Sequence, residues 1–132
     1  MKINDYEIKP CADLRGAYFK GVNLEDVNLE GANLENANLQ GANLKGANLR
    51  GAYLKYACLK DANLKGTNLK GAYLEGSYLE GANLEDANLE NVNLENANLG
   101  GTTLENKEDV KVKYLEDELK KYKDTLKVLL DT

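Results

Sequence analysis

The sequence has 132 residues, of which 42% are hydrophobic, and a formal net charge of −5 at pH 7. This length favours one domain with at most a small appendage, and the acidic balance argues against general nucleic-acid binding, which needs a basic surface. The chain contains two cysteines and no histidine. That composition excludes the usual zinc and transition-metal ligand sets and the Ser–His and Cys–His nucleophile pairs of enzymes.

The chain shows no sign of a targeting or membrane-spanning segment. Its first ten residues mix Lys, Asp and Glu, so they lack the apolar stretch of a signal peptide. No apolar run approaches the ~20 residues that a bilayer requires. We therefore expect a soluble, cytoplasmic protein.

Residues 1–11 are expected to form an N-terminal cap. Tyr6 and Ile8 alternate with charged residues, which is the period-two pattern of a strand. Pro10, which lacks a backbone N–H group, then ends that pattern. A short strand-like segment should therefore precede the part of the chain that begins at residue 12.

From residue 12 to residue 106 the sequence repeats every five residues. Leucine is the central residue of nineteen consecutive repeats, from Leu14 to Leu104, with Phe19 as its one replacement. We name the other positions by their place relative to it. The inner residue lies two positions before the leucine and is small or β-branched, and the outward residue lies one position before the leucine and is usually Asn. The residue directly after the leucine is usually charged. The corner residue lies two positions after the leucine and is usually Gly, Asn or Asp.

This pattern indicates an all-β solenoid. A period of five does not match the 3.6 residues of a helical turn, whereas residues two apart on extended backbone point to the same side. The inner residue and the leucine therefore face the core together, and the outward residue faces solvent. Gly, Asn and Asp at the corner tolerate the positive φ that turns often need. Stacked coils about 4.8 Å apart then bury the leucines of one another.

These repeats resemble the A(D/N)LXX signature of the pentapeptide repeat family. Residues 32–36 (Ala-Asn-Leu-Glu-Asn) and 82–86 (Ala-Asn-Leu-Glu-Asp) are plain examples. The resemblance implies a right-handed, quadrilateral β-helix with four repeats per coil, so that residues 12–106 make nearly five coils. The period alone does not fix four sides, and the distribution of charges does not decide it.

One neighbourhood departs from the Asn and Gly pattern at five outward or corner positions: Tyr53, Tyr56, Cys58, Tyr73 and Tyr78. With twenty residues per coil, the two tyrosines of one column would stack. An aromatic ladder that adds stability is one interpretation. A partner-binding patch is the other, because exposed tyrosine is enriched at protein interfaces.

Other side chains twenty residues apart should also be neighbours. We expect cross-coil ion pairs, each worth about 0–1 kcal/mol, between lysines and glutamates in the order Lys55–Glu75, Lys60–Glu80, Lys65–Glu85 and Lys70–Glu90. Columns of outward asparagines should hydrogen-bond as amide ladders, for example Asn23, Asn43, Asn63 and Asn83.

No disulfide is expected between Cys11 and Cys58. The two residues are more than two coils apart, which is at least ~9 Å along the stack, beyond the ~7 Å limit between Cα atoms. Cys58 should be an exposed free thiol.

Residues 107–132 change to a helical period. An apolar stripe along this helix comprises Leu115, Leu119, Tyr122, Leu126 and Leu129. The stripe could cap the last coil, or it could join two copies of the chain as a homodimer. The sequence leaves both alternatives open.

The expected function is that of a non-catalytic scaffold for protein–protein interaction, with no cofactor, no metal and no direct nucleic-acid or membrane partner. A convex tower without a cleft cannot desolvate its carboxylates as acid–base catalysis requires. The resemblance implies an alternative, a DNA-mimicking protein that binds a topoisomerase such as gyrase. Overall acidity and the C-terminal helix agree with that alternative, but basic residues from Lys45 to Lys70 interrupt any acidic strip.

Overall fold

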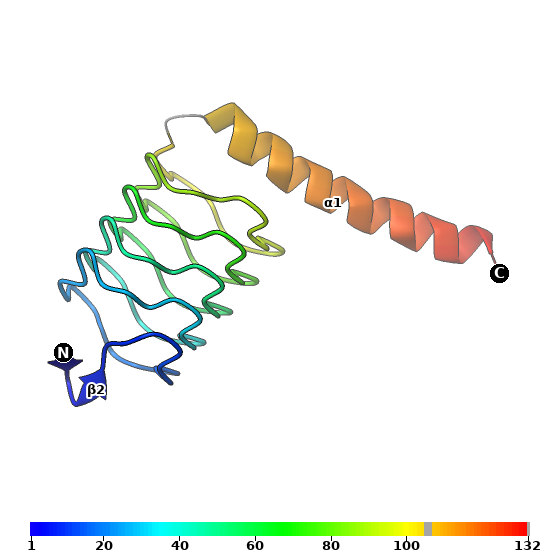
Figure 1. Ribbon diagram of the computed structural model, residues 1–132. Coiled ribbons are helices and arrows are strands. Elements are labelled where there is room, and N and C mark those ends of the chain that lie inside the picture. The colour runs from blue at the N-terminus through cyan, green and yellow to red at the C-terminus, as the bar shows by residue number, and fades with distance from the viewer. Residues whose placement is uncertain (105–106, 132) are drawn as a thin grey trace.

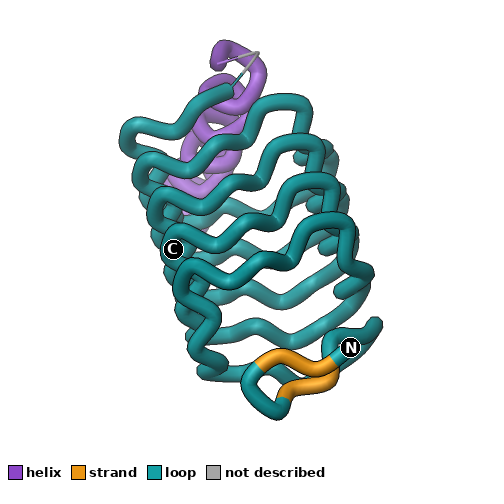
Figure 2. The backbone as a smooth tube through the Cα atoms, turned by 90° about the vertical axis from the view of Figure 1, so that its left-hand side faces the viewer, coloured by secondary structure: helices purple, strands orange, loops and turns teal. Residues whose placement is uncertain are grey.

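The computed structural model describes residues 1–104 and 107–131, with residues 107–114 and 117 described by their backbone alone. The chain forms a tower of stacked coils with a hairpin at its N-terminal end and one helix after its last coil (Figure 1, Figure 2). Within the described residues, no helix combines the length and the apolar character needed to span a bilayer.

The N-terminal segment is a two-stranded hairpin. Strands β1 (Lys2–Ile3) and β2 (Tyr6–Glu7) pair in antiparallel orientation. The turn between them holds Asn4 and Asp5 at φ values of 50° and 67°, a conformation that these two residue types tolerate and that two-residue hairpins require. The sequence pattern indicated the second strand but not the first.

This hairpin covers the first coil of the tower. The ring of Tyr6 packs edge-on against Phe19, with 5.6 Å between ring centroids and 79° between ring planes. Ile8 is buried, and its backbone N–H donates to the carbonyl of Met1 at 2.8 Å. The apolar end of the solenoid is therefore shielded by side chains from the hairpin.

Parallel backbone bridges join residues twenty positions apart, from Asp13 with Asn33 to Asn83 with Thr103. Between coils, the N–H of Leu34 donates to the carbonyl of Tyr53 at 2.7 Å. Twenty residues are four repeats, so each coil has four short sides (Figure 2). The chain is thus a β-solenoid, and the right-handed sense of its winding stays a prediction from the resemblance.

The central leucines fill the axis of the tower. Leu44 and Leu64 have no exposed surface, and Leu84 is 3% exposed. Burial decreases in the last coil, where Leu99 and Leu104 are half-buried. The core is therefore continuous through the middle coils and opens toward the end that precedes the helix.

The outward asparagines bond mainly within their own repeats. Oδ1 of Asn23 accepts from the N–H of Glu25 at 3.0 Å, and Oδ1 of Asn63 accepts from the N–H of Lys65 at 3.1 Å. Among the described residues, one amide–amide bond links two coils, from Asn43 to Asn23 at 3.4 Å. The predicted amide ladder is therefore wrong for most of its column, because a short Asn side chain reaches the N–H two residues ahead within its own turn.

The helix α1 (Lys107–Leu130) begins after the last coil and extends beyond it (Figure 1). Its polar side faces the tower, since Nζ of Lys121 lies 3.8 Å from a carboxylate oxygen of Glu95. The apolar stripe points elsewhere, and all five of its side chains are more than half exposed: Leu115, Leu119, Tyr122, Leu126 and Leu129. The interpretation of this stripe as a cap on the last coil is therefore wrong. Positions two apart on a helix differ by about 200°, so Leu119 cannot face the tower together with Lys121.

Candidate functional site

Tyr53 and Tyr73 form a stacked aromatic pair on one side of the tower. Their backbones are bridged in parallel, and their rings are 4.8 Å apart and inclined by only 3°. A parallel ladder gives both side chains the same direction at the coil spacing, which places the rings face to face. Both remain exposed, by 42% and 43%.

Tyr56 occupies the corner that follows Tyr53 and has a φ of 60°, an unusual backbone conformation for a bulky residue. Its ring lies over the backbone of Gly76, one coil later: a Cβ atom at residue 76 would be 2.5 Å from Cε1 of Tyr56. Nζ of Lys55 lies 5.3 Å from the centroid of the same ring, within cation–π range. The ring of Tyr56 thus lies near both the Lys55 charge and the Gly76 backbone while Tyr56 remains 52% exposed.

Tyr78 and Cys58 share the next side of the tower, where their backbones are bridged. Tyr78 is 47% exposed, whereas Cys58 is half-buried. The prediction of an exposed Cys58 thiol is therefore wrong, because the side chain is only partly exposed. The bridged neighbours Tyr78 and Asn38 flank Cys58 above and below. Both Cys58 and Cys11 are free thiols.

The structure places the five predicted residues on two adjacent sides and the corner between them. We call the four exposed aromatic residues Tyr53, Tyr56, Tyr73 and Tyr78 the tyrosine face. Tyr18 is also exposed, but it lies two coils below Cys58 in the same bridged column and outside this group.

Two glutamates beside the tyrosine face have carboxylate oxygens that are buried and accept no hydrogen bond within the described part of the chain: Oε1 of Glu75 and Oε2 of Glu80. Each follows a tyrosine by two residues, where other repeats have an outward asparagine. Sequence reasoning treated both only as members of ion pairs. The sequence did contain a signal for these two glutamates, namely the tyrosine two residues before each of them. A tyrosine at the outward position removes the asparagine side chain that usually accepts a hydrogen bond from the backbone N–H two residues later.

Burial raises the pKa of the Glu75 carboxyl above its ordinary value. A hydrogen bond from its own backbone and the charge of Lys55 lower this pKa, and the charges of Glu95 and Glu35 raise it further. Burial therefore makes ionisation of the Glu75 carboxyl less favourable in the folded chain than in the unfolded chain.

Two of the four predicted cross-coil ion pairs are present. Lys65 and Glu85 approach to 3.9 Å, and Lys70 and Glu90 to 3.7 Å. Among the described side chains, Glu75 and Glu80 have no such contact with the lysines one coil below them. All of these groups are partly exposed, so each observed pair contributes little to stability.

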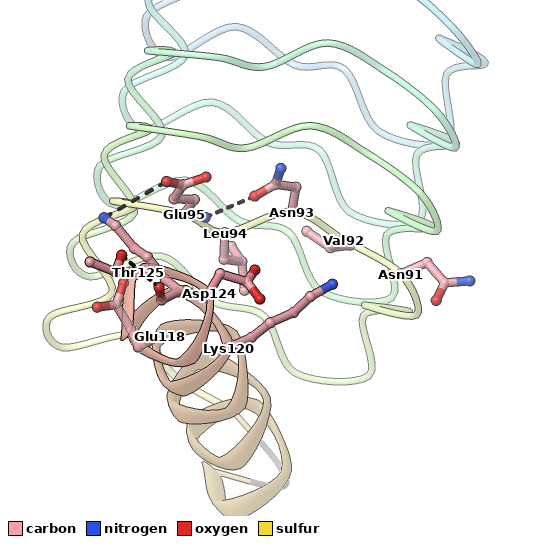
Figure 3. Close-up of a pocket in the computed structure, with 10 residues that line it drawn as sticks. Asn91, Val92, Asn93, Leu94, Glu95, Glu118, Lys120, Asp124 and Thr125 are labelled. Carbon is pink, nitrogen blue, oxygen red and sulfur yellow. Dashed lines mark hydrogen bonds and ion pairs between the residues drawn. The ribbon is translucent and has the colours of Figure 1, made fainter. Parts of the chain in front are cut away.

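A separate hollow lies between the last coil and α1 (Figure 3). Residues 91–95 line one wall, and side chains of α1, including Lys121 and Asp124, line the other. The ion pair of Lys121 with Glu95 crosses the hollow. Over the residues that the structure describes, no group of three or more acidic or cysteine side chains could hold a metal ion.

The repeats of this chain match the model of a known protein family. The model of the pentapeptide repeats matches residues 12–51, 32–71 and 67–106, with eight copies. The chain is a member of the pentapeptide repeat family. This match confirms the resemblance that the A(D/N)LXX pattern suggested, and it covers the whole of the tower.

Two solved structures of pentapeptide repeat proteins are similar to this chain. One comes from the thylakoid lumen of Arabidopsis thaliana, with 32% identity, a TM-score of 0.69, and coverage of 76% of this chain and 72% of that one. The other is Rfr23 from the cyanobacterium Cyanothece 51142, with 34% identity, a TM-score of 0.53, and coverage of 73% and 63%. No curated protein matches the sequence significantly. Pentapeptide repeat proteins are structural repeat proteins, and neither comparison gives a positive sign of catalysis.

Proposed function

We propose that this pentapeptide repeat protein is a non-catalytic scaffold that binds a partner protein through the tyrosine face. The observation that supports this most is the exposed, stacked pair of Tyr53 and Tyr73. Tyrosines anchor protein interfaces because they combine a large apolar surface with a polar tip and few rotatable bonds. The bridged coils beneath hold these rings in fixed positions, which lowers the entropy lost on binding.

The local chemistry supports the same proposal. Each outward tyrosine replaces an asparagine that would accept a backbone N–H two residues ahead, as Asn63 does. Beside the tyrosines, Glu75 and Glu80 each carry one buried carboxylate oxygen that accepts no hydrogen bond from the described residues. A partner that presents Arg, Lys or amide groups would supply donors to these carboxylates and pack on the aromatic rings.

The test is an affinity capture from the source cells with the purified protein as bait. The variant Tyr53→Asn/Tyr73→Asn restores the residue type common at the outward position, so the tower should keep its fold. The matched control is Tyr18→Asn, which removes an exposed outward tyrosine outside the tyrosine face. We expect a partner captured by the wild type and the control and lost by the double variant. Recovery of the same proteins by all three would contradict the proposal.

Mimicry of DNA toward a topoisomerase is not favoured by the surface. A mimic needs an acidic strip along the tower, yet the column of charged positions on the side of the stacked tyrosines contains Arg15 and Lys55. In the other described columns, Lys60, Lys65 and Lys70 interrupt the acidic residues. We therefore expect no inhibition of gyrase supercoiling by micromolar protein, and inhibition would favour the mimic over the scaffold.

A further inference from the structure

We propose that the tower carries a second docking surface, a basic face that binds a short acidic segment of another protein. Four side chains on two adjacent sides of the tower define the basic face: Lys45, Arg50, Lys65 and Lys70. These are the two sides that do not carry the tyrosine face, so the proposal does not depend on the partner proposed above. A chain with a net charge of −5 repels acidic partners in general, and a local basic surface is where such a partner can bind.

The four cations stack in two columns. Twenty residues separate the two members of each column, and the coils are bridged at that spacing. The N–H of Gly46, for example, donates to the carbonyl of Lys65 at 2.9 Å. Lys45 therefore lies directly below Lys65, at the ~4.8 Å spacing of bridged strands. The same spacing places Arg50 below Lys70, and like charges in this position repel each other.

The two upper cations turn toward the coil above them. Nζ of Lys65 lies 3.9 Å from a carboxylate oxygen of Glu85. Nζ of Lys70 lies 3.7 Å from a carboxylate oxygen of Glu90. The two lower cations form no ion pair within the described residues, and both are exposed. Their charges are therefore available to an anion from outside the chain.

The asparagines beside these cations add hydrogen-bond donors. Oδ1 of Asn48 accepts from the N–H of Arg50 at 3.0 Å, and Oδ1 of Asn68 accepts from the N–H of Lys70 at 3.1 Å. The amide oxygens are thus engaged within their own repeats, whereas the Nδ2 groups of both asparagines donate no hydrogen bond to another described residue. Cations and amide donors together are the groups that bind a carboxylate.

Glutamates bound the basic face above and below, which sets the size of the partner's acidic segment. Glu25 and Glu30 lie one coil below the face, and Glu85 and Glu90 lie one coil above it. A long polyanion such as duplex DNA, laid along the tower, would meet carboxylates at both ends of the face and would be repelled there. A few carboxylates on one short protein segment fit between these two acidic borders.

Fluorescence anisotropy with a labelled hexaglutamate peptide tests the basic face. We expect the wild type to bind this peptide saturably at about 50 mM salt and to bind it at least about threefold more weakly at about 300 mM salt, because salt screens exposed charges. The neutral hexaglutamine peptide should not bind. Absence of hexaglutamate binding at about 1 mM protein, or tighter binding of a short DNA duplex than of hexaglutamate, would overturn the proposal.

Two double variants locate the binding. Lys45→Gln/Arg50→Gln should weaken hexaglutamate binding at least about fivefold. The matched control, Lys55→Gln/Lys60→Gln, removes the same amount of positive charge from the sides of the tyrosine face, and it should keep the affinity within about twofold of the wild type. Equal losses in the two variants would mean that net charge alone attracts the peptide, and would overturn the proposal.

Thermal unfolding tests the same charges without a peptide. Because Lys45 and Arg50 lie below like charges, Lys45→Gln/Arg50→Gln should raise the midpoint of thermal unfolding by about 1–4 °C at low salt. This gain should shrink at about 1 M salt, where exposed charges are screened. A variant that unfolds at a lower temperature than the wild type would show that the tower already satisfies these two cations, and would overturn the proposal.

Discussion

The ring of Tyr56 occupies the space above Gly76 in which a side chain at residue 76 would begin. This contact joins two consecutive corners of the tower, and it makes the identity of one residue depend on the other. Gly76→Ala should therefore be more damaging than the same change at a corner with open space.

Gly71 supplies the control, because it has a φ of 67° and a Cβ there would meet nothing within 4 Å. We expect Gly71→Ala to lower the free energy of unfolding by about 1–2 kcal/mol through backbone strain alone. Gly76→Ala should lower it by about 1–3 kcal/mol more because of the overlap with the ring. Chemical denaturation measures both, and in a Tyr56→Gly background the change Gly76→Ala should cost no more than Gly71→Ala does. Equal losses at the two glycines would contradict the packing of the ring.

Replacing the Glu75 carboxyl by an amide should stabilise the tower at neutral pH. The folded state raises the pKa of Glu75, so it binds the proton more tightly than the unfolded chain does. Stability therefore falls as pH rises from the ordinary glutamate pKa of 4.5 through the higher pKa of the folded state. Glu75→Gln removes this loss, and its advantage over the wild type should vanish below about pH 4.

Thermal unfolding of Glu75→Gln and wild type across pH 3.5–8 measures this difference. The matched control is Glu85→Gln, which removes a carboxylate paired with Lys65 and should change stability by only about 0–1 kcal/mol. A Glu75→Gln variant less stable than the wild type at pH 7 would show that the carboxylate is satisfied.

Tyr73→Asn should separate a structural role of the tyrosines from a binding role. The change loses a ring stack worth about 0.5–1.5 kcal/mol and allows the asparagine acceptor to bond the N–H of Glu75, worth about 0.5–1.5 kcal/mol. We expect the free energy of unfolding to stay within about 1 kcal/mol of the wild-type value. A loss of 3 kcal/mol or more in denaturant would favour the aromatic ladder as a stabilising element.

The loss of stability caused by truncating a core leucine should depend on where that leucine lies along the tower. Leu64→Ala should lower the free energy of unfolding by about 2–5 kcal/mol, because Leu64 is fully buried in a middle coil. Leu104→Ala should cost less, because Leu104 is only half-buried in the last coil. Similar losses in denaturant would indicate that the end of the tower is as tightly packed as its middle.

The sequence predicted the solenoid because its period of five places the inner residue and the leucine on one side of an extended segment. It could not fix the number of sides by itself, since a coil of any number of repeats satisfies the same inward pattern. Four sides came from the family resemblance, and the backbone bridges between residues twenty apart show them directly. The stack of Tyr53 on Tyr73 followed from that spacing.

The remaining features depend on side-chain directions that no pattern encodes. An amphipathic stripe on α1 shows that one helix face is apolar, but it does not say whether that face meets the tower, and here Lys121 faces it instead. The buried oxygens of Glu75 and Glu80 likewise depend on how each carboxylate turns once the local asparagine is missing. Packing decides such choices, and packing is visible only in three dimensions.

Because the backbone bridges connect only neighbouring coils, the tower should tolerate insertions or deletions of one whole coil of twenty residues. Deleting residues 22–41 would remove a full turn of the chain and leave Tyr53 above its former column and below Tyr73, because the bridged residues are twenty apart. Deleting residues 62–66 would rotate every later segment by a quarter turn and bring Tyr78, in place of Tyr73, above Tyr53. Natural insertions and deletions in such a gene are therefore expected to accumulate in multiples of sixty nucleotides.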